Sequence, residues 1–338
     1  MLNFKDILLL VAVFGSLGLA LAWPDLGAPL APLLIYFLIS LLFLSFLQLN
    51  PQEIWSSWKN HGLILLLMGI IKLVALPLVL YFPFYWFWPE YALPVLLLSG
   101  ISTGVVAPFI SGLVGAQTPL VLGLVVLTSL VVPFSLPVLV KLLAGEELRL
   151  SFAAMFRVLA LIIFLPAFLA LIMKKISPGL TRRIGRIRYP LSLIFFALIN
   201  QAVFSRYQDF FRARPQELLN AALIAYLLSI VFHGVGWGLS WGQEVGVRLA
   251  QAVSLAYVNN ILVVVFSAQF FGPLSPTLAA MYLLPFFTLI VPLRLLGERS
   301  SESLSAEAGS FRVRGAKGSR IQVKNRAEAF FLLDSSTP

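Results

Sequence analysis

The first candidate site is the stretch STGVVAP, which lies inside an apolar run that only a bilayer would accommodate. Its candidate residues are Ser102, Thr103, Gly104, Ala107 and Pro108. Proline removes a backbone donor and clashes with the preceding turn, so the helix should break near Ala107. Secondary transporters use such breaks at membrane depth to bind substrate and ions. A kinked but inert helix is the alternative, because Gly and Pro are common in membrane helices.

Amide and hydroxyl side chains mark two further runs. SLAYVNNILVVVF carries the adjacent amides Asn259 and Asn260, which face different sides of a helix, so one neighbouring helix would rarely satisfy both. Thr128 offers a hydroxyl oxygen, although a bond to its own helix backbone is the simpler explanation. We predict a second interruption near Tyr257–Asn260, close in space to the first.

Lys72 is a charge deep within a predicted span, LILLLMGIIKLVALPLVLYF. A lysine at the bilayer centre costs about 3 kcal/mol, so such a residue is a functional candidate. About eleven span residues precede it and about ten follow, which at ~1.5 Å per residue leaves ~15 Å to either end. A lysine stem does not cover that length, which favours a function over snorkelling to the interface. Burial disfavours the charged form of an amine, so proton coupling is also open.

Composition places these residues in an all-α polytopic membrane protein. The 338 residues are 60% hydrophobic and 11% charged, whereas a soluble domain has about 25% charged residues. The apolar runs are long and unalternating, as membrane helices are. We predict about ten spans, at about 7–22, 29–48, 61–82, 91–115, 119–143, 151–173, 188–205, 218–241, 248–271 and 274–296.

Several function classes are excluded by composition. The chain has no cysteine for a thiolate site or nucleophile, and its two histidines do not build a histidine-rich metal site. All fourteen Asp and Glu residues lie outside the predicted spans, which argues against a membrane hydrolase with a carboxylate pair and against an intramembrane aspartate antiport site. We expect no enzyme activity, no metal site and no cofactor. The net charge of +10 sits mainly in one loop and the C-terminal tail, so it does not indicate nucleic-acid binding.

Basic residues predict the orientation of the chain. The stretch KKISPGLTRRIGRIRY, residues 174–189, is predicted to be a cytoplasmic loop. With the N-terminus inside, cytoplasmic segments hold seventeen of the 24 Lys and Arg residues, and the opposite side holds five. Both termini should therefore be cytoplasmic, in a multi-pass protein of the cell (inner) membrane. Residues 298–338 are polar and basic, and we expect a largely disordered tail near the anionic inner leaflet.

The predicted membrane domain, residues 1–297, divides near Gly145 into halves of about 1–145 and 146–297. Each half has five predicted spans, and the fourth span of each half holds the polar interruption. An odd number of spans gives the halves opposite topology. Matching interruptions in two such halves are the best sequence pointer to an inverted-repeat transporter with a midplane site.

These segments resemble the bile acid:sodium symporter family over roughly residues 24–296, as a bacterial-type member with a divergent sodium site. The similar segments are LISLLFLSFLQLNPQEI, the stretch from ISTGVVAP to PVLVKLL, and SLAYVNNILVVVFSAQFFGPLSP. The resemblance implies ten helices in two inverted five-helix repeats. It also implies a core domain with two broken, crossing helices, a panel domain against which the core moves, and inward transport of organic anions with sodium.

The chain departs from the family at the residues that bind sodium. Where the family reads Pro-Gly-Gly, two residues and Ser-Asn, this chain has STGVVAP, so Pro108 replaces the sodium-binding asparagine. Leu255 takes the position of the family's glutamate, and Asn259 and Asn260 take the place of a Gln-Asn pair. These changes remove a carboxylate and other oxygen ligands from the implied site.

Two further positions complete the comparison with the family. Thr128 keeps a hydroxyl ligand position, and Lys72 stands where the family often has a glutamine five residues before a proline. An ammonium beside a sodium ion would repel it by several kcal/mol at low dielectric. The sequence therefore argues against sodium coupling. As coupling ion, the sequence leaves sodium and a proton as the two alternatives.

We predict a secondary transporter for a small organic anion, in which the Lys72 ammonium replaces a bound cation. The expected partners are this anion and the lipid bilayer. The alternative is a transporter-like binding or sensory membrane protein that no longer moves solute. Solute flux in liposomes distinguishes the two.

Overall fold

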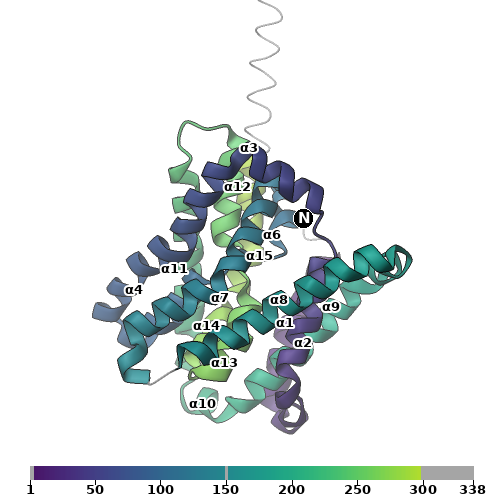
Figure 1. The fold of residues 1–338 in the computed structure, drawn as a ribbon. Helices are drawn as coiled ribbons and strands as arrows, with labels where there is room; N and C mark the ends of the chain where they lie inside the picture. The colour runs from purple at the N-terminus through teal and green to yellow at the C-terminus, as the bar shows by residue number, and fades with distance from the viewer. Residues whose placement is uncertain (1–3, 149–150, 298–338) are drawn as a thin grey trace, which may run out of the picture.

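The computed structural model describes residues 4–148 and 151–297, which form helices and one isolated β-bridge (Figure 1). The helices are α1 (Phe4–Ala22), α2 (Leu34–Phe46), α3 (Pro51–Ile70), α4 (Leu76–Phe87), α5 (Pro89–Gly100), α6 (Ala107–Val114), α7 (Thr118–Leu148), α8 (Phe152–Ile176), α9 (Pro178–Arg206), α10 (Gln208–Ala213), α11 (Gln216–Leu239), α12 (Val245–Ala256), α13 (Asn260–Phe270), α14 (Leu274–Met281) and α15 (Leu283–Thr288). Short turns of other helix types are η1 (Pro24–Leu26), η2 (Ala28–Leu33) and η3 (Ile71–Ala75). The tail predicted over 298–338 lies outside the described residues.

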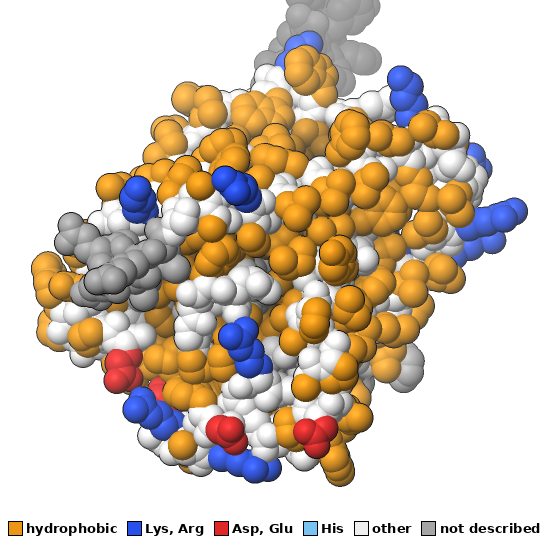
Figure 2. Space-filling model, turned by 60° about the horizontal axis from the view of Figure 1, so that its bottom comes forward, with side chains coloured by type: hydrophobic (Ala, Val, Ile, Leu, Met, Phe, Trp, Pro, Cys, Tyr) orange, Lys and Arg blue, Asp and Glu red, His pale blue; other side chains and the backbone are white. Residues whose placement is uncertain are grey.

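Seven helical segments of the described chain are long and apolar enough to cross a membrane. They are Pro24–Phe46, Pro51–Phe87, Thr118–Ala144, Phe152–Ile176, Pro178–Arg206, Gln216–Leu239 and Leu274–Gly297. Large hydrophobic side chains stay exposed on the outer faces of helices, with Phe87 at 87% and Leu142 at 75%. Figure 2 shows such side chains over most of one face. An apolar surface of this extent suits lipid, and the chain is a multi-pass membrane protein.

The helices form two groups. Helices α1, α2, α8 and α9 lie together on the right in Figure 1, where α2 packs against both α8 and α9, and α1 packs against α9. The broken helices and their neighbours α3, α4, α7, α11 and α14 form the other group, and α13 contacts α2, α8 and α9 across the boundary.

The basic stretch over residues 174–189 is helical, so its prediction as a loop was wrong. Helix α8 continues to Ile176, the chain turns at Ser177, and α9 begins at Pro178. Proline suits this position because the first turn of a helix leaves its N–H groups unbonded in any case. The seventh predicted span, 188–205, is therefore the second part of a longer helix that begins ten residues earlier.

The first break lies slightly before the predicted position. Helix α5 ends at Gly100, residues 101–106 are not helical, and Ala107 begins α6. Pro108 thus occupies the first turn of the second half-helix, where its missing donor costs nothing, rather than the middle of a kinked helix. The second break lies where the sequence predicts it, because α12 ends at Ala256 and α13 begins at Asn260.

Candidate functional site

The two breaks meet through backbone hydrogen bonds. Thr103 and Val258 form an antiparallel bridge. On its two sides, the Gly104 N–H donates to the Tyr257 carbonyl at 2.7 Å, and the Asn259 N–H donates to the Ser102 carbonyl at 2.9 Å. Two segments about 150 positions apart are therefore fixed side by side, as the paired polar interruptions predict. Each break supplies partners for backbone groups that the other break frees.

Gly104 is the position at which the two backbones come closest. A Cβ atom on Gly104 would lie 2.8 Å from the Val258 carbonyl oxygen and 3.0 Å from that of Tyr257. Both atoms are backbone, so they could withdraw only if the second break moved. Glycine is therefore required here by contact distance.

We expect Gly104→Ala to push the breaks apart and to lower the midpoint of thermal unfolding by several degrees, because a buried overpacking contact costs about 1–3 kcal/mol. Gly112→Ala is the matched control, since a Cβ atom on Gly112 of α6 would meet no neighbouring atom within 4 Å. Equal midpoints for the two purified variants would contradict the close approach.

A disulfide between the breaks should form without distortion. The bonds on either side make Thr103 and Val258 a non-hydrogen-bonded antiparallel pair, whose Cα atoms lie about 4.5 Å apart. That distance is within the range for disulfides. In a chain with no native cysteine, we expect Thr103→Cys with Val258→Cys to oxidise nearly completely, as read by a gel shift that reductant reverses. Free thiols in the double variant under oxidising conditions would show that the breaks do not pair.

A local widening of the helix positions Lys72. Residues Ile71–Ala75 form one π-helical turn between α3 and α4, just before Pro77. The proline ring would clash with the carbonyl of Leu73 in a regular α-helix, and a wider turn relieves this clash. The turn places the Lys72 side chain inside the protein, with only 1% of its surface exposed. Lys72 therefore does not snorkel to an interface.

The Lys72 ammonium lies at the second break. Its Nζ donates a hydrogen bond to the Leu255 carbonyl at 3.1 Å and lies 4.9 Å from the centroid of the Phe232 ring. The carbonyl end of a helix carries a partial negative charge, and an aromatic face also attracts a cation. Lys72 and Leu255 thus meet in space, and the ammonium contacts the backbone of the residue that stands in the glutamate position.

Other donors occupy the remaining carbonyls at the end of α12. The Thr103 hydroxyl donates to the Ser254 carbonyl at 2.8 Å, and the Tyr282 hydroxyl donates to the Ala256 carbonyl at 2.7 Å. Together with the bond from Lys72, three successive carbonyls each have a side-chain donor. A helix end normally leaves such groups for water, a cap or a ligand. Here the protein itself fills the positions where a cation would find oxygen ligands.

The Thr128 hydroxyl bonds both to its own helix and to the first break. It donates to the Leu124 carbonyl of its own helix at 2.6 Å and accepts the Thr103 N–H at 3.0 Å. The bond to its own helix was the simpler expectation from the sequence, and the second bond adds a tie to the first break. Thr128 therefore joins α7 to the crossing.

The two asparagines lie beside the bridge, at the start of α13. Asn259 is the N-cap residue and Asn260 the first helical residue, and both are at least nine-tenths buried. The Asn260 amide reaches the Ala279 carbonyl at 3.5 Å. Within residues 4–148 and 151–297, no hydrogen bond engages the Asn259 side chain, so this amide could accept a polar ligand.

Three buried hydroxyls at the breaks have no partner among the described residues. They belong to Ser102, Ser254 and Tyr257. Of these, Ser254 and the tyrosine were not predicted from the sequence as site residues. A signal was present, since both are polar positions of the run that contains the asparagine pair. Unpartnered buried hydroxyls indicate a place for water or for a polar ligand.

One carboxylate is buried, contrary to the expectation that every Asp and Glu lies outside the spans. Glu217, in the first turn of α11, is 6% exposed. Its carboxylate accepts from the Tyr91 hydroxyl at 2.8 Å and from the Asn220 amide at 3.3 Å. A helix N-terminus stabilises such a charge, and the bond from Tyr91 ties α11 to α5. Among the described side chains, no other carboxylate is buried.

Comparison with protein families matches residues 35–214 of this chain to the Sodium Bile acid symporter family. The match covers about half of the chain and includes the first break, Lys72 and Thr128. The second break lies beyond the matched range. No curated protein matches the sequence.

Proposed function

Because the chain belongs to the sodium bile acid symporter family, we propose that it is a secondary transporter of a small organic anion that does not use sodium. The observation that carries the second part is the Lys72 ammonium on the Leu255 carbonyl. A fixed positive charge stands where a coupling ion would neutralise the end of α12. The transporter then needs no ion to stabilise the crossing.

A sodium ion fits poorly beside this ammonium. Two unit charges 4 Å apart repel by about 4 kcal/mol at an effective dielectric constant of 20. The neighbouring carbonyls already accept protein donors, and Leu255 offers no carboxylate. Sodium would therefore have to displace hydrogen bonds and overcome repulsion without a negative side chain to balance it.

The anion would bind where the half-helices α6 and α13 begin. The positive ends of these helices adjoin the bridge, and broken helices in transporters direct such ends at anionic groups. Ala107 and Pro108 form the start of α6, and the Asn259 and Asn260 amides add donors at the start of α13. Lys72 acts at longer range, as the charge that makes this region attractive to a carboxylate or sulfonate.

We further propose ten spans in two inverted five-helix repeats, with both termini cytoplasmic in the cell membrane. The support is that two broken spans, the half-helix pairs α5–α6 and α12–α13, accompany the longer helices and occupy corresponding places in the two halves of the chain. The excess of Lys and Arg around residues 174–188 and after 293 supports the orientation.

Reporter fusions test this orientation. We expect fusions at Ser177 and after Ser301 to report the cytoplasm and one near Ala213 to report the outside, because basic residues are retained inside. An outside signal at Ser177 would contradict the topology and the inverted repeat with it.

A thermal-shift screen of the purified protein with organic anions tests the proposed function. Ligands that bind the folded state raise the unfolding midpoint by mass action. We expect stabilisation by at least one carboxylate or sulfonate, of equal size in sodium and choline buffers. A stabilisation that requires sodium would contradict the proposal.

A further inference from the structure

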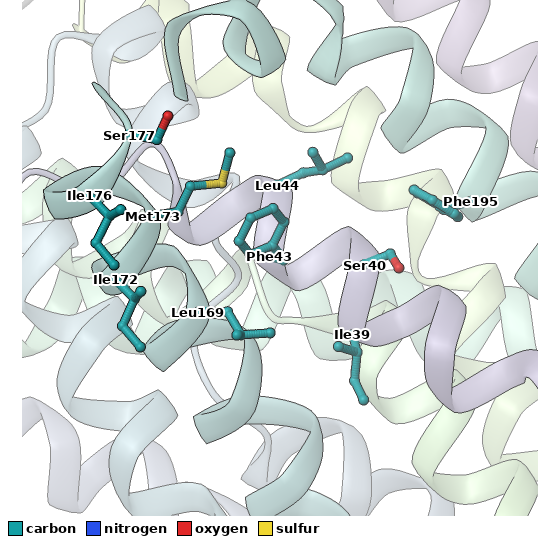
Figure 3. A pocket seen from close by; sticks show the side chains of 10 residues that line it. All are labelled: Ile39, Ser40, Phe43, Leu44, Leu169, Ile172, Met173, Ile176, Ser177 and Phe195. Atoms are coloured by element: carbon teal, nitrogen blue, oxygen red, sulfur yellow. The ribbon is translucent and has the colours of Figure 1, made fainter. Parts of the chain in front are cut away.

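A second candidate site lies outside the crossing. Helices α2, α8 and α9 line a cavity of about 570 Å³ that is largely open to the outside (Figure 3). Leu169, Ile172, Met173 and Ile176 line it from α8, at spacings of three and four residues that place them on one helix face. Phe195 faces it from α9, and apart from two serines its lining is apolar. Its volume is in the range of small-molecule sites, ~300–1,000 Å³.

One end of the cavity reaches the basic turn between α8 and α9. Ser177, which lines the cavity, both ends α8 and precedes α9. The exposed basic residues around this turn are Lys175, Arg182, Arg183 and Arg186. Figure 2 shows Lys and Arg side chains gathered at the far right end of the molecule, where the α8–α9 hairpin projects in Figure 1.

Arg188 lies on α9 between the basic turn and Phe195. It is half-buried and lies seven residues before Phe195, which places both side chains on the same face of α9. Lys174, by contrast, is engaged within the protein, since its ammonium donates to the Phe46 and Leu49 carbonyls at the end of α2. Arg188 is therefore the basic residue of α9 that shares the helix face of Phe195.

The three helices that line the cavity carry no negative charge to balance the basic residues at this end. Residues 151–208, which include all of α8 and α9, contain no Asp or Glu, and neither do residues 26–52 around α2. An apolar cavity with a cationic rim matches a molecule with a hydrocarbon chain and an anionic head. Basic pockets between membrane helices on the cytoplasmic side bind anionic lipid head groups in this way.

We propose that the cavity binds one acyl chain of an anionic phospholipid, whose phosphate is held by Arg188 and the basic α8–α9 turn. The lipid comes from the leaflet that faces this turn, which is the cytoplasmic leaflet if the topology under Proposed function holds. Arginine suits the phosphate because its planar donors bind two oxygens at once. A lipid at this position links α2 to α8 and α9 and so stabilises the group of four helices that includes α1.

Native mass spectrometry of the full-length protein tests this proposal without any transport assay. The purified chain is exchanged into detergent with equal amounts of phosphatidylglycerol and phosphatidylcholine, and the retained lipid is identified. We expect one retained phosphatidylglycerol per chain. Arg188→Gln should weaken its retention about fivefold, the value that corresponds to the loss of one basic residue near an anionic head group.

Matched variants separate the cavity from general surface effects. Met173→Trp fills the cavity and should abolish retention, whereas Leu142→Trp, on an exposed position of α7, should retain the lipid. Arg214→Gln, an exposed arginine outside the α8–α9 turn, controls for charge. Unfolding midpoints show whether Met173→Trp is folded. If it is not folded, retention of the two phospholipids by Arg188→Gln tests the proposal without it.

Three results would overturn the proposal. One is equal retention of the two phospholipids by the unmodified protein. Another is unchanged retention in Arg188→Gln, or in a folded Met173→Trp. The third is displacement of the lipid by a soluble organic anion at equimolar concentration, which would assign the cavity to solute instead. None of these outcomes bears on sodium independence, so failure here is distinguishable from failure of the proposed function.

Discussion

Changing Lys72 to glutamine is expected to reduce uptake of the organic anion by about 100-fold. The change removes the positive charge at the second break and weakens the bond to the Leu255 carbonyl. A hydrogen bond from a charged group contributes about 1.5–3 kcal/mol, and ~2.7 kcal/mol corresponds to a factor of about 100. Lys72→Arg should also impair uptake, because a planar guanidinium does not fit a site shaped by a compact ammonium and the Phe232 ring.

Lys59→Gln is the control for the Lys72 variants, since Lys59 is an exposed lysine of α3. Its uptake should match that of the unmodified protein. The double variant Lys72→Gln with Leu255→Glu restores the family's residue types at two positions, so its uptake should respond partly to sodium. The response should stay partial because Pro108 still replaces the family's asparagine. A clear sodium requirement in the unmodified protein would refute the substitution of the ion by Lys72.

Solute distribution across a liposome membrane is expected to follow the membrane potential rather than a sodium gradient. A fixed ammonium stays in the protein during the cycle, so the net charge moved per cycle is that of the anion alone. Moving one charge through 100 mV changes its free energy by about 2.3 kcal/mol, which is a factor of roughly 50 in concentration. With a potassium diffusion potential that is negative inside, a monovalent anion should therefore be depleted inside by up to that factor.

Three gradients separate the possible mechanisms in this experiment. A sodium gradient without a membrane potential should leave the anion at equal concentrations inside and outside the liposomes. Replacing sodium with choline should give the same result. Accumulation that follows a proton gradient would instead make the proton the coupling ion. Binding without flux under every gradient would support the alternative of a sensory or binding protein, and empty liposomes control for leakage.

The amino-acid sequence alone determined the class of this protein and the neighbourhood of its site. Long apolar runs and low charge require a bilayer, because water cannot solvate them favourably. Gly104, Pro108 and the asparagine pair mark the breaks through local backbone chemistry, with Pro108 beginning the second half-helix. Such chemistry acts within a few residues, so it can be inferred from the sequence. The burial of Lys72 followed in the same way from its distance to both ends of a span.

The tertiary structure decided which groups meet. Lys72 and Leu255 are 183 positions apart, and no local rule states that the ammonium reaches that carbonyl. Long-range pairing also fixes the register of Thr103 against Val258. Contact with other helices decides burial, so Glu217 is enclosed beside Tyr91 although it lies at a helix start. The basic run over 174–189 is helical because Pro178 can begin a helix, while its charges alone suggest a loop.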